Sequence, residues 1–354
     1  MALESYRSGQ SKINFKLYGA GPPLVLFHPS PNSSLMMHDL AVLLSKHFTV
    51  VCPDTPGYGR SPKLAVDHPS MNDYALAFHD LFKRLGFDSI ACYGSATGAQ
   101  IAIRYGILFP EHTSHLFLDN CAHFTDAERE QILANYFPDL TPSLDGQHLV
   151  RLWDMVSNLF RFFPWCFKDE DHQLSGPIPP PSVLHSIVQD YLQAGTDYDI
   201  AYRAAFDHEK VDYIQQLIVA TTVLRWEGSI LKKYTDRIFD HELPDNVHGQ
   251  KISADRSLRY IEIVDHIVTT YKSKQEYSKD ALIPKLIVDT EKISVAEFNT
   301  EPPKPDANGL YLIKAWHELR DQEFLNDTLV DNQEKQNGEA LQRSLVSWFT
   351  NYKN

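Results

Sequence analysis

The N-terminal third of the chain alternates short apolar runs with longer amphipathic segments, and this alternation limits how the chain can fold more than any other feature. Apolar runs within 22–31, 47–61 and 89–94 stop at proline or glycine, which predicts buried strands that lead into turns. The segments at 34–46 and 71–87 between them have the spacing of helices. Such alternation predicts the α/β class, a mostly parallel sheet with helices on both faces.

The alternation is interrupted at about residue 123, where roughly a hundred helical, aromatic-rich residues begin. Strand patterns return near residue 218, so an insertion into a sheet domain fits better than two consecutive domains. We expect the C-terminal segment to supply a second lid-like element. The predicted parts are a sheet core at 1–122 and 219–275, a helical cap at 123–218 and a C-terminal helical extension at 276–354.

Composition and charge exclude several kinds of partner. The 354 residues are 43% hydrophobic, enough for a sizeable core, and the net charge is −13. Because nucleic acids and anionic membranes are also negative, we expect neither as a partner. The N-terminus lacks an apolar signal region, no stretch suits a bilayer, and the four cysteines show no paired spacing. We therefore expect a cytoplasmic protein, monomeric or homodimeric, that binds a small organic molecule.

The stretch "CYGSATGAQIAIRYG" at 92–106 is the candidate catalytic turn. A nucleophile elbow has the pattern G-x-nucleophile-x-G, because so tight a strand-to-helix turn needs small residues on both sides of the reactive one. Gly94 and Gly98 have this spacing, which puts Ala96 at the nucleophile position. A register centred on Ser95 would place bulky side chains at both flanking positions. The sequence therefore predicts an elbow whose reactive position holds alanine.

Two further motifs precede this turn, His28-Pro29-Ser30-Pro31 and "DTPGYGRS" at 54–61. In this order the three motifs resemble the α/β-hydrolase fold family, which typically has HG-x-P at the first and D-x-P-G-x-G-x-S at the second. The close resemblance covers 13–122, and a looser one reaches about 253. It implies the fold and, by default, hydrolysis. We see no dinucleotide-binding or Walker pattern and no metal-ligand spacing, so no cofactor and no metal are expected.

The resemblance also implies roles around the turn. The backbone N–H groups of Ser30 and Thr97 would form an oxyanion hole, which stabilises charge developing on a carbonyl oxygen. His28 is expected to be a structural anchor of its loop rather than a catalytic group. Asn32 either adds a side-chain donor near the hole or caps the helix that begins near Ser34.

The catalytic acid and base are displaced from where the resemblance expects them. Glu227 is the carboxylate nearest to the expected turn after the cap, and Asp119, at the end of an earlier strand, is the second option. The loop at 253–256 offers no histidine for the base. His266 lies beyond it in a helix, where a surface or core role is expected. His317 is the preferred histidine, with an exposed helical histidine as the competing interpretation.

Aromatic residues of the cap are the expected specificity element. Some must be core, and others would line an apolar pocket between cap and sheet. We therefore expect a medium-sized, partly apolar or aromatic substrate. The candidate substrate-binding residues are His28, Asn32, Trp153, Phe163 and Trp165.

Three hypotheses for function stay open. The first is a cofactor-free hydrolase of an ester, lactone or activated C–C bond, with Ala96 as an inactivating substitution. The second is a lyase, decarboxylase or isomerase of a branch that does not use the standard triad, in which the turn resembles an HTGA pattern. The third is a binding protein or pseudoenzyme that retains the pocket to hold a ligand.

Overall fold

The structure is a computed structural model that describes residues 2–8, 11–271 and 277–278. Within these ranges, residues 2–140 and 149–271 belong to one compact unit. Apart from Tyr277–Ser278, the extension predicted at 276–354 lies outside the described residues, and His317 with it. Its predicted roles therefore stay predictions.

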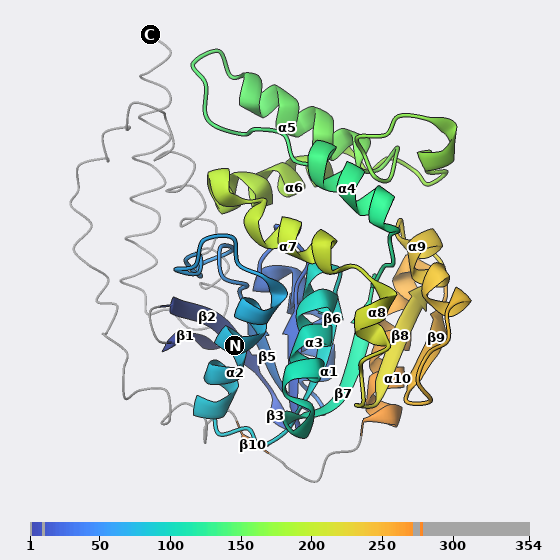
Figure 1. Ribbon diagram of the computed structural model, residues 1–354. Helices are drawn as coiled ribbons and strands as arrows, with labels where there is room; N and C mark the ends of the chain where they lie inside the picture. Colours follow the sequence, from blue (N-terminus) through green and yellow to red (C-terminus); the bar gives the residue numbers. More distant parts are fainter. Residues whose placement is uncertain (1, 9–10, 272–276, 279–354) are drawn as a thin grey trace, which may run out of the picture. The chain divides into compact units, whose positions relative to one another are not determined.

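An eight-stranded sheet forms the centre of this unit, in the order β1-β2-β5-β4-β6-β7-β8-β9 (Figure 1). From β5 to β9 neighbouring strands run parallel. The β1–β2 hairpin adds to β5 in the antiparallel sense, and the sequence pattern does not predict β1. The strands are β1 (Ala2–Ser8), β2 (Ser11–Tyr18), β4 (Pro23–Phe27), β5 (Thr49–Pro53), β6 (Ile90–Ser95), β7 (Thr113–Asp119), β8 (Thr221–Trp226) and β9 (Val247–Ile252). A separate two-stranded sheet pairs β3 (Ala20–Gly21) with β10 (Tyr277–Ser278).

Helices cover both faces of the sheet, as the alternating pattern predicts. On one face α2 (Met71–Arg84) and α3 (Thr97–Leu108) pack on Val25, Val51 and other strand residues. On the other, α1 (His38–Leu44) and α10 (Arg256–Thr270) pack on a second core. Strands β4 and β5 are buried at every position, since helices lie on both sides of them.

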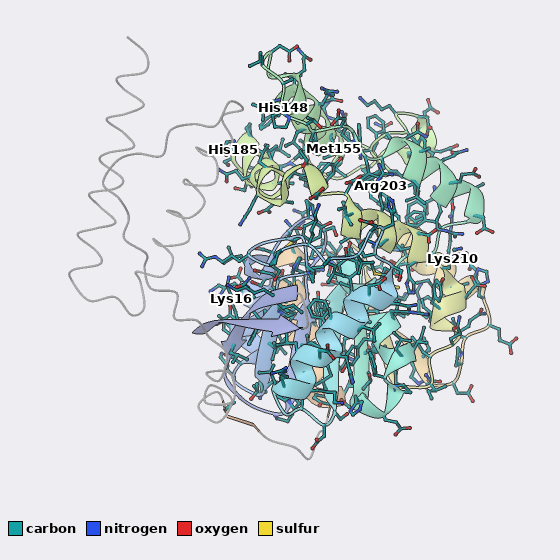
Figure 2. The ribbon with its side chains drawn as sticks, turned by 60° about the vertical axis from the view of Figure 1, so that its left-hand side comes forward. Lys16, His148, Met155, His185, Arg203 and Lys210 are labelled. Carbon is teal, nitrogen blue, oxygen red and sulfur yellow. The ribbon has the colours of Figure 1, made fainter. Side chains whose placement is uncertain are left out.

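The cap lies between β7 and β8 in sequence, and helices joined by loops make up its regular structure. Its helices are α4 (Asp126–Asn135), α5 (Gln147–Asn158), α6 (Pro181–Ala194), α7 (Ile200–His208) and α8 (Val211–Ile214). Figure 2 marks Met155 on α5 and Arg203 on α7 in the cap, and Lys16 on β2 in the sheet. The chain then returns through β8 and α9 (Lys232–Asp236).

Hydrogen bonds fix the cap over the carboxyl ends of the parallel strands. The Tyr58 hydroxyl donates to the Tyr198 carbonyl at 2.7 Å. Lys63 pairs with Asp197 at 2.7 Å on the surface, where such a pair contributes little. No helix in the described part of the chain has the length and apolar character needed to cross a membrane.

Candidate active site

Ala96 sits in the sharp turn between β6 and α3, with φ 50° and ψ −113°. Glycine is the residue that tolerates positive φ without cost, so alanine is strained here. A Cβ on Gly94 would lie 2.2 Å from the Gly98 carbonyl oxygen, and one on Gly98 would lie 2.2 Å from the Phe27 carbonyl oxygen. The backbone therefore has the predicted elbow geometry, although its central residue carries no reactive group.

The two expected oxyanion donors lie on neighbouring strand ends. Phe27 of β4 pairs with Gly94 of β6, so the loop that holds Ser30 begins beside the elbow. Thr97 is the first residue of α3, and its N–H therefore has no carbonyl four residues earlier within the helix. This arrangement supports the predicted oxyanion hole, with the positive end of the α3 dipole behind it.

His28 is an anchor for its loop. Its side chain is fully buried, Nδ1 lies 2.9 Å from the Pro29 carbonyl, and Nε2 accepts the Thr55 N–H at 2.9 Å. Burial lowers the pKa of His28, which keeps the ring neutral. Both ring nitrogens are engaged, which fits the structural role expected from the sequence.

Asn32 connects the same loop to the cap. Its side-chain amide donates to the Asp190 carboxylate of α6 at 2.7 Å. The helical segment that follows is capped by Ser33, whose hydroxyl accepts the Leu35 N–H. The capping alternative for Asn32 is therefore wrong, because the cap position falls one residue later.

Asp119 lies at the predicted strand end, opposite Ser95 of β6. Its ion-pair partner is an arginine and not a histidine. Asp119 is fully buried, accepts the Tyr93 hydroxyl at 2.6 Å and pairs with Arg259 of α10. The Arg259 guanidinium lies 4.2 Å from the centre of the Trp226 ring. Both contacts are to Oδ2, and the buried Oδ1 has no hydrogen-bond partner among the described residues, so Arg259 offsets the charge of Asp119 without occupying both of its oxygens.

Glu227 and His266 lie at the far edge of the sheet. Both line a cavity of about 640 Å³ between the end of β9 and α10, and Ala96 is not among its lining residues. Glu227 is 3.5 Å from the Lys232 ammonium, and His266 Nε2 is 3.4 Å from the Thr222 hydroxyl. Neither of these described contacts is to Ala96, and the catalytic role of Glu227 stays a prediction.

A mostly aromatic cluster, formed by the cap and by the chain before and after it, packs against Ala96. We define this aromatic cluster as Ala122, Phe124, Ile132, Tyr136, Phe163, Phe206, Leu231 and Tyr234, with the partly buried Trp165 and Tyr202 beside it. Phe163 belongs to this cluster and Trp165 packs against it, so their predicted contact with a substrate stays a prediction. Trp153 is 41% exposed on α5 and outside the cluster, so the structure does not bring it to Ala96.

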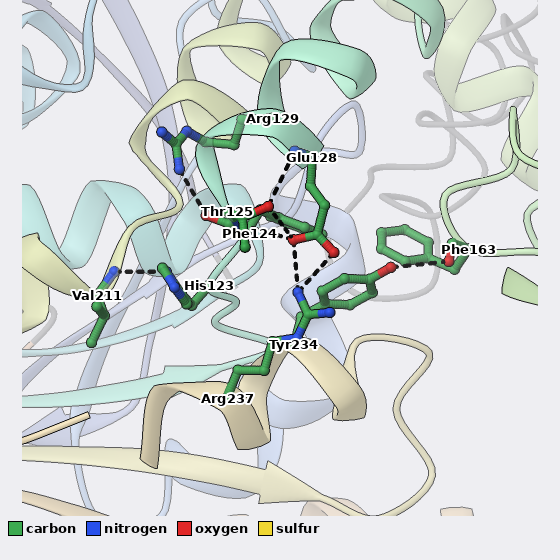
Figure 3. Close-up of polar contacts among 9 residues, drawn as sticks. All are labelled: His123, Phe124, Thr125, Glu128, Arg129, Phe163, Val211, Tyr234 and Arg237. Carbon is green, nitrogen blue, oxygen red and sulfur yellow. Dashed lines mark hydrogen bonds and ion pairs between the residues drawn. The ribbon is translucent and has the colours of Figure 1, made fainter. Parts of the chain in front are cut away.

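Polar contacts hold the aromatic cluster in place (Figure 3). The Tyr234 hydroxyl donates to the Phe163 carbonyl at 3.4 Å, and Arg129 donates to the Phe124 carbonyl at 2.7 Å. The Glu128 carboxylate pairs with Arg237 at 2.7 Å, which ties α4 to the chain after α9. In the described ranges no three His, Cys, Asp or Glu side chains are grouped to hold a metal ion.

Glu209 is a buried carboxyl beside the aromatic cluster that the sequence did not single out. It is 4% exposed, and its Oε2 atom has no hydrogen-bond partner among the described residues. Burial raises its pKa well above the usual value for a glutamate, although Arg129 opposes the shift. The local sequence "FDHEKVDY" gives no sign that this glutamate is buried, because its burial depends on how α7 packs.

Comparisons with known proteins agree with this architecture. Residues 22–141 match the family model for the alpha/beta hydrolase fold. A putative alpha/beta hydrolase from Nostoc has a TM-score of 0.55 and 23% identity over 77% of this chain and 98% of its own. An epoxide hydrolase has a TM-score of 0.54 and 16% identity over 76% and 97%. These likenesses show that the chain has the α/β-hydrolase fold.

Curated relatives match over a shorter stretch. A fluoroacetate dehalogenase from Burkholderia is 35% identical over 107 residues, which are 29% of this chain and 35% of that protein. An uncharacterised protein of Mycobacterium tuberculosis is 30% identical over 104 residues, 29% of this chain and 30% of that protein. The chain thus spans about a third of the length of the curated relatives that it matches.

Proposed function

We propose that this chain is a cofactor-free α/β-hydrolase-fold enzyme that hydrolyses an ester, lactone or activated C–C bond of a small organic molecule. The strained elbow carries the proposal: Ala96 has φ 50°, between two glycines that cannot accept a Cβ. Strain of this kind persists where the surrounding structure enforces it, and it collects at active sites. The amides of Ser30 and Thr97 would stabilise the developing oxyanion.

The expected substrate follows from the surroundings of the elbow. Aromatic side chains of the cap pack against Ala96, so a bound molecule would meet rings on one side and backbone donors on the other. A partly apolar carbonyl compound fits both. The names of the dehalogenase relative and the epoxide hydrolase neighbour also point to small organic substrates. The proposal includes no nucleic acid or membrane partner and places the enzyme in the cytoplasm.

A non-hydrolytic reaction is the second candidate, and the Asp119–Arg259 pair favours it. Arg259 already offsets the negative charge of Asp119, so this acid would stabilise the imidazolium of a catalytic histidine less than an unpaired aspartate does. Without a nucleophile at residue 96, no covalent intermediate forms there. A lyase, decarboxylase or isomerase would need the oxyanion hole and a separate proton donor or acceptor.

Position 96 is the place to test these alternatives. The chain, A96S and A96H are incubated with esters, lactones, amides and β-keto acids in oxygen-18 water, and the products are analysed by mass spectrometry. Hydrolysis predicts turnover in A96S or A96H with one heavy oxygen in the acid product. The double-glycine elbow should accept either side chain, since Ala96 is only partly buried.

The other outcomes separate the remaining hypotheses. Turnover by the unaltered chain, with products that lack the heavy oxygen, would replace hydrolysis by the non-hydrolytic reaction. Tight binding of a panel compound with no turnover in any of the three proteins would leave a ligand-binding pseudoenzyme. A96V, which adds bulk and no reactive group at the same position, serves as the matched control.

A further inference from the structure

We propose that Glu209 is the proton donor of the reaction at the elbow, giving its proton to the oxygen that leaves the substrate. The inference rests on the proposed function, because it assigns a role within the same site. Glu209 lies just after α7, outside every motif that the sequence resemblance covers. Three observations carry it: the position of its backbone, the groups around its side chain, and its protonation.

The backbone of Glu209 is fixed against the aromatic cluster. Its carbonyl accepts the Phe124 N–H at 3.1 Å, and its own N–H donates to the Phe206 carbonyl at 3.3 Å. Phe124 and Phe206 both belong to the aromatic cluster that packs against Ala96. The residue is therefore attached from two sides to the wall that faces the elbow.

Neighbouring side chains place the carboxyl next to the first turn of α3. Gln100, four residues after Ala96, contacts His208 Nδ1 at 3.0 Å and the Cys121 sulfur at 3.8 Å. After burial, an ionised Glu209 would raise the pKa of Cys121 and of Tyr202 further, which fits a carboxyl close to both side chains. The carboxyl thus lies among the elbow helix, the end of β7 and the cap.

Among the ionisable side chains around it, Glu209 is the one suited to donate a proton. Burial raises its pKa, so the buried carboxyl stays protonated above the usual range of glutamate. The facing groups do not compete for the role: Tyr202 has a pKa raised to about 12, and His208 one lowered to about 3, both chiefly by burial. Burial also raises the pKa of the Cys121 thiol. Arg129 faces the carboxyl but donates to the Phe124 carbonyl and pairs with Asp126.

In ester hydrolysis the proposed step balances as follows. The bond between acyl carbon and leaving oxygen breaks, and that oxygen takes the Glu209 proton and departs as an alcohol. The water oxygen that bonds to the acyl carbon releases a proton, which returns to the Glu209 carboxylate. Ester and water give acid and alcohol, and the enzyme is regenerated. With serine at residue 96, the serine oxygen bonds to the acyl carbon, the alcohol departs with the Glu209 proton, and the serine proton passes to the Glu209 carboxylate. Water then hydrolyses the acyl-serine to the acid and free serine.

The test compares two esters that differ in their need for a proton. Methyl benzoate releases a poor leaving group, whereas 4-nitrophenyl acetate releases one that departs without help. We expect E209Q to lower kcat/KM for methyl benzoate by about 100-fold, a usual contribution of general acid catalysis, and to change the nitrophenyl ester little. E130Q, on the exposed surface of α4, is the matched control and should change neither. All variants are made in the chain and in A96S.

A pH profile adds a second readout. Activity on methyl benzoate should fall as pH rises through the Glu209 pKa, and this limb should be missing in E209Q. Equal losses on both esters, or a pH limb that survives in E209Q, would overturn the assignment and leave Glu209 a structural residue. Turnover of neither ester by the chain or A96S would instead remove the hydrolytic proposal, and this role with it.

Discussion

At the scale of single residues, the elbow shows a conflict between side chain and backbone. Ala96 is held at φ 50°, and the same turn excludes a Cβ at the two flanking glycines. The spacing of Gly94 and Gly98 made the turn predictable, because it reflects a steric requirement that is local. The strain at Ala96 could not be predicted from the sequence, since it depends on strand β4 lying against Gly98.

Replacing Ala96 by glycine should therefore stabilise the protein. Relief of the positive φ outweighs the extra entropy of the unfolded chain, and we expect A96G to raise the free energy of unfolding by about 1 kcal/mol. Denaturant unfolding measures the change. The control A134G, at an exposed position in α4, should have the opposite sign, with a loss of up to about 1 kcal/mol. Destabilisation by A96G would show that the turn is not strained.

At the scale of elements, the ordered alternation of strands and helices was predictable and the contacts between elements were not. Buried runs such as β4 and β5 are recognisable because strands covered on both faces are continuously apolar. The β1–β2 hairpin escaped prediction, since β1, "ALESYRS", alternates too little to stand out. Helix α4 depends on local signals: Thr125 and Glu128 form a capping box at its start.

Removing the cap residue tests how α4 is held. Thr125 accepts the Glu128 N–H at 3.2 Å, and Glu128 reaches on to Arg237 (Figure 3). We expect T125A to lower the free energy of unfolding by about 1 kcal/mol. S186A removes an exposed hydroxyl within α6 and should stay within about 0.5 kcal/mol of the parent chain. If T125A changes the free energy of unfolding by less than about 0.5 kcal/mol, the Glu128–Arg237 ion pair holds the start of α4 without the cap.

At the scale of the whole molecule, buried ionisable groups connect the fold to pH. His208 is 7% exposed and is stacked on Tyr213 at 3.8 Å between ring centres. Burial, with help from Arg104 and Lys210, lowers its pKa from 6.5 to about 3. Below pH 6.5 the unfolded chain therefore binds a proton that the folded chain refuses until about pH 3. The stability associated with His208 is lost as the pH falls through that window.

The matched pair H208Q and H185Q isolates this effect. In the parent chain the His208 contribution declines by about 1.4 kcal/mol per pH unit between pH 6.5 and pH 3. Denaturant unfolding across pH should show a shallower acid decline in H208Q. H185Q, at an exposed position of α6, should follow the parent curve. Parallel curves for all three proteins would show that His208 is protonated in the folded state.

The sequence by itself determined the α/β class, the parallel strands, the inserted helical cap and the elbow with alanine at its centre. These features depend on periodicity and on glycine spacing, which are local properties of the chain. Only the tertiary structure decided which charged residues meet. It paired Asp119 with Arg259 across 140 positions, placed Glu227 and His266 at another edge, and buried Glu209 beside the aromatic cluster. Such partners depend on the packing of distant elements, and pattern along a sequence does not record that packing.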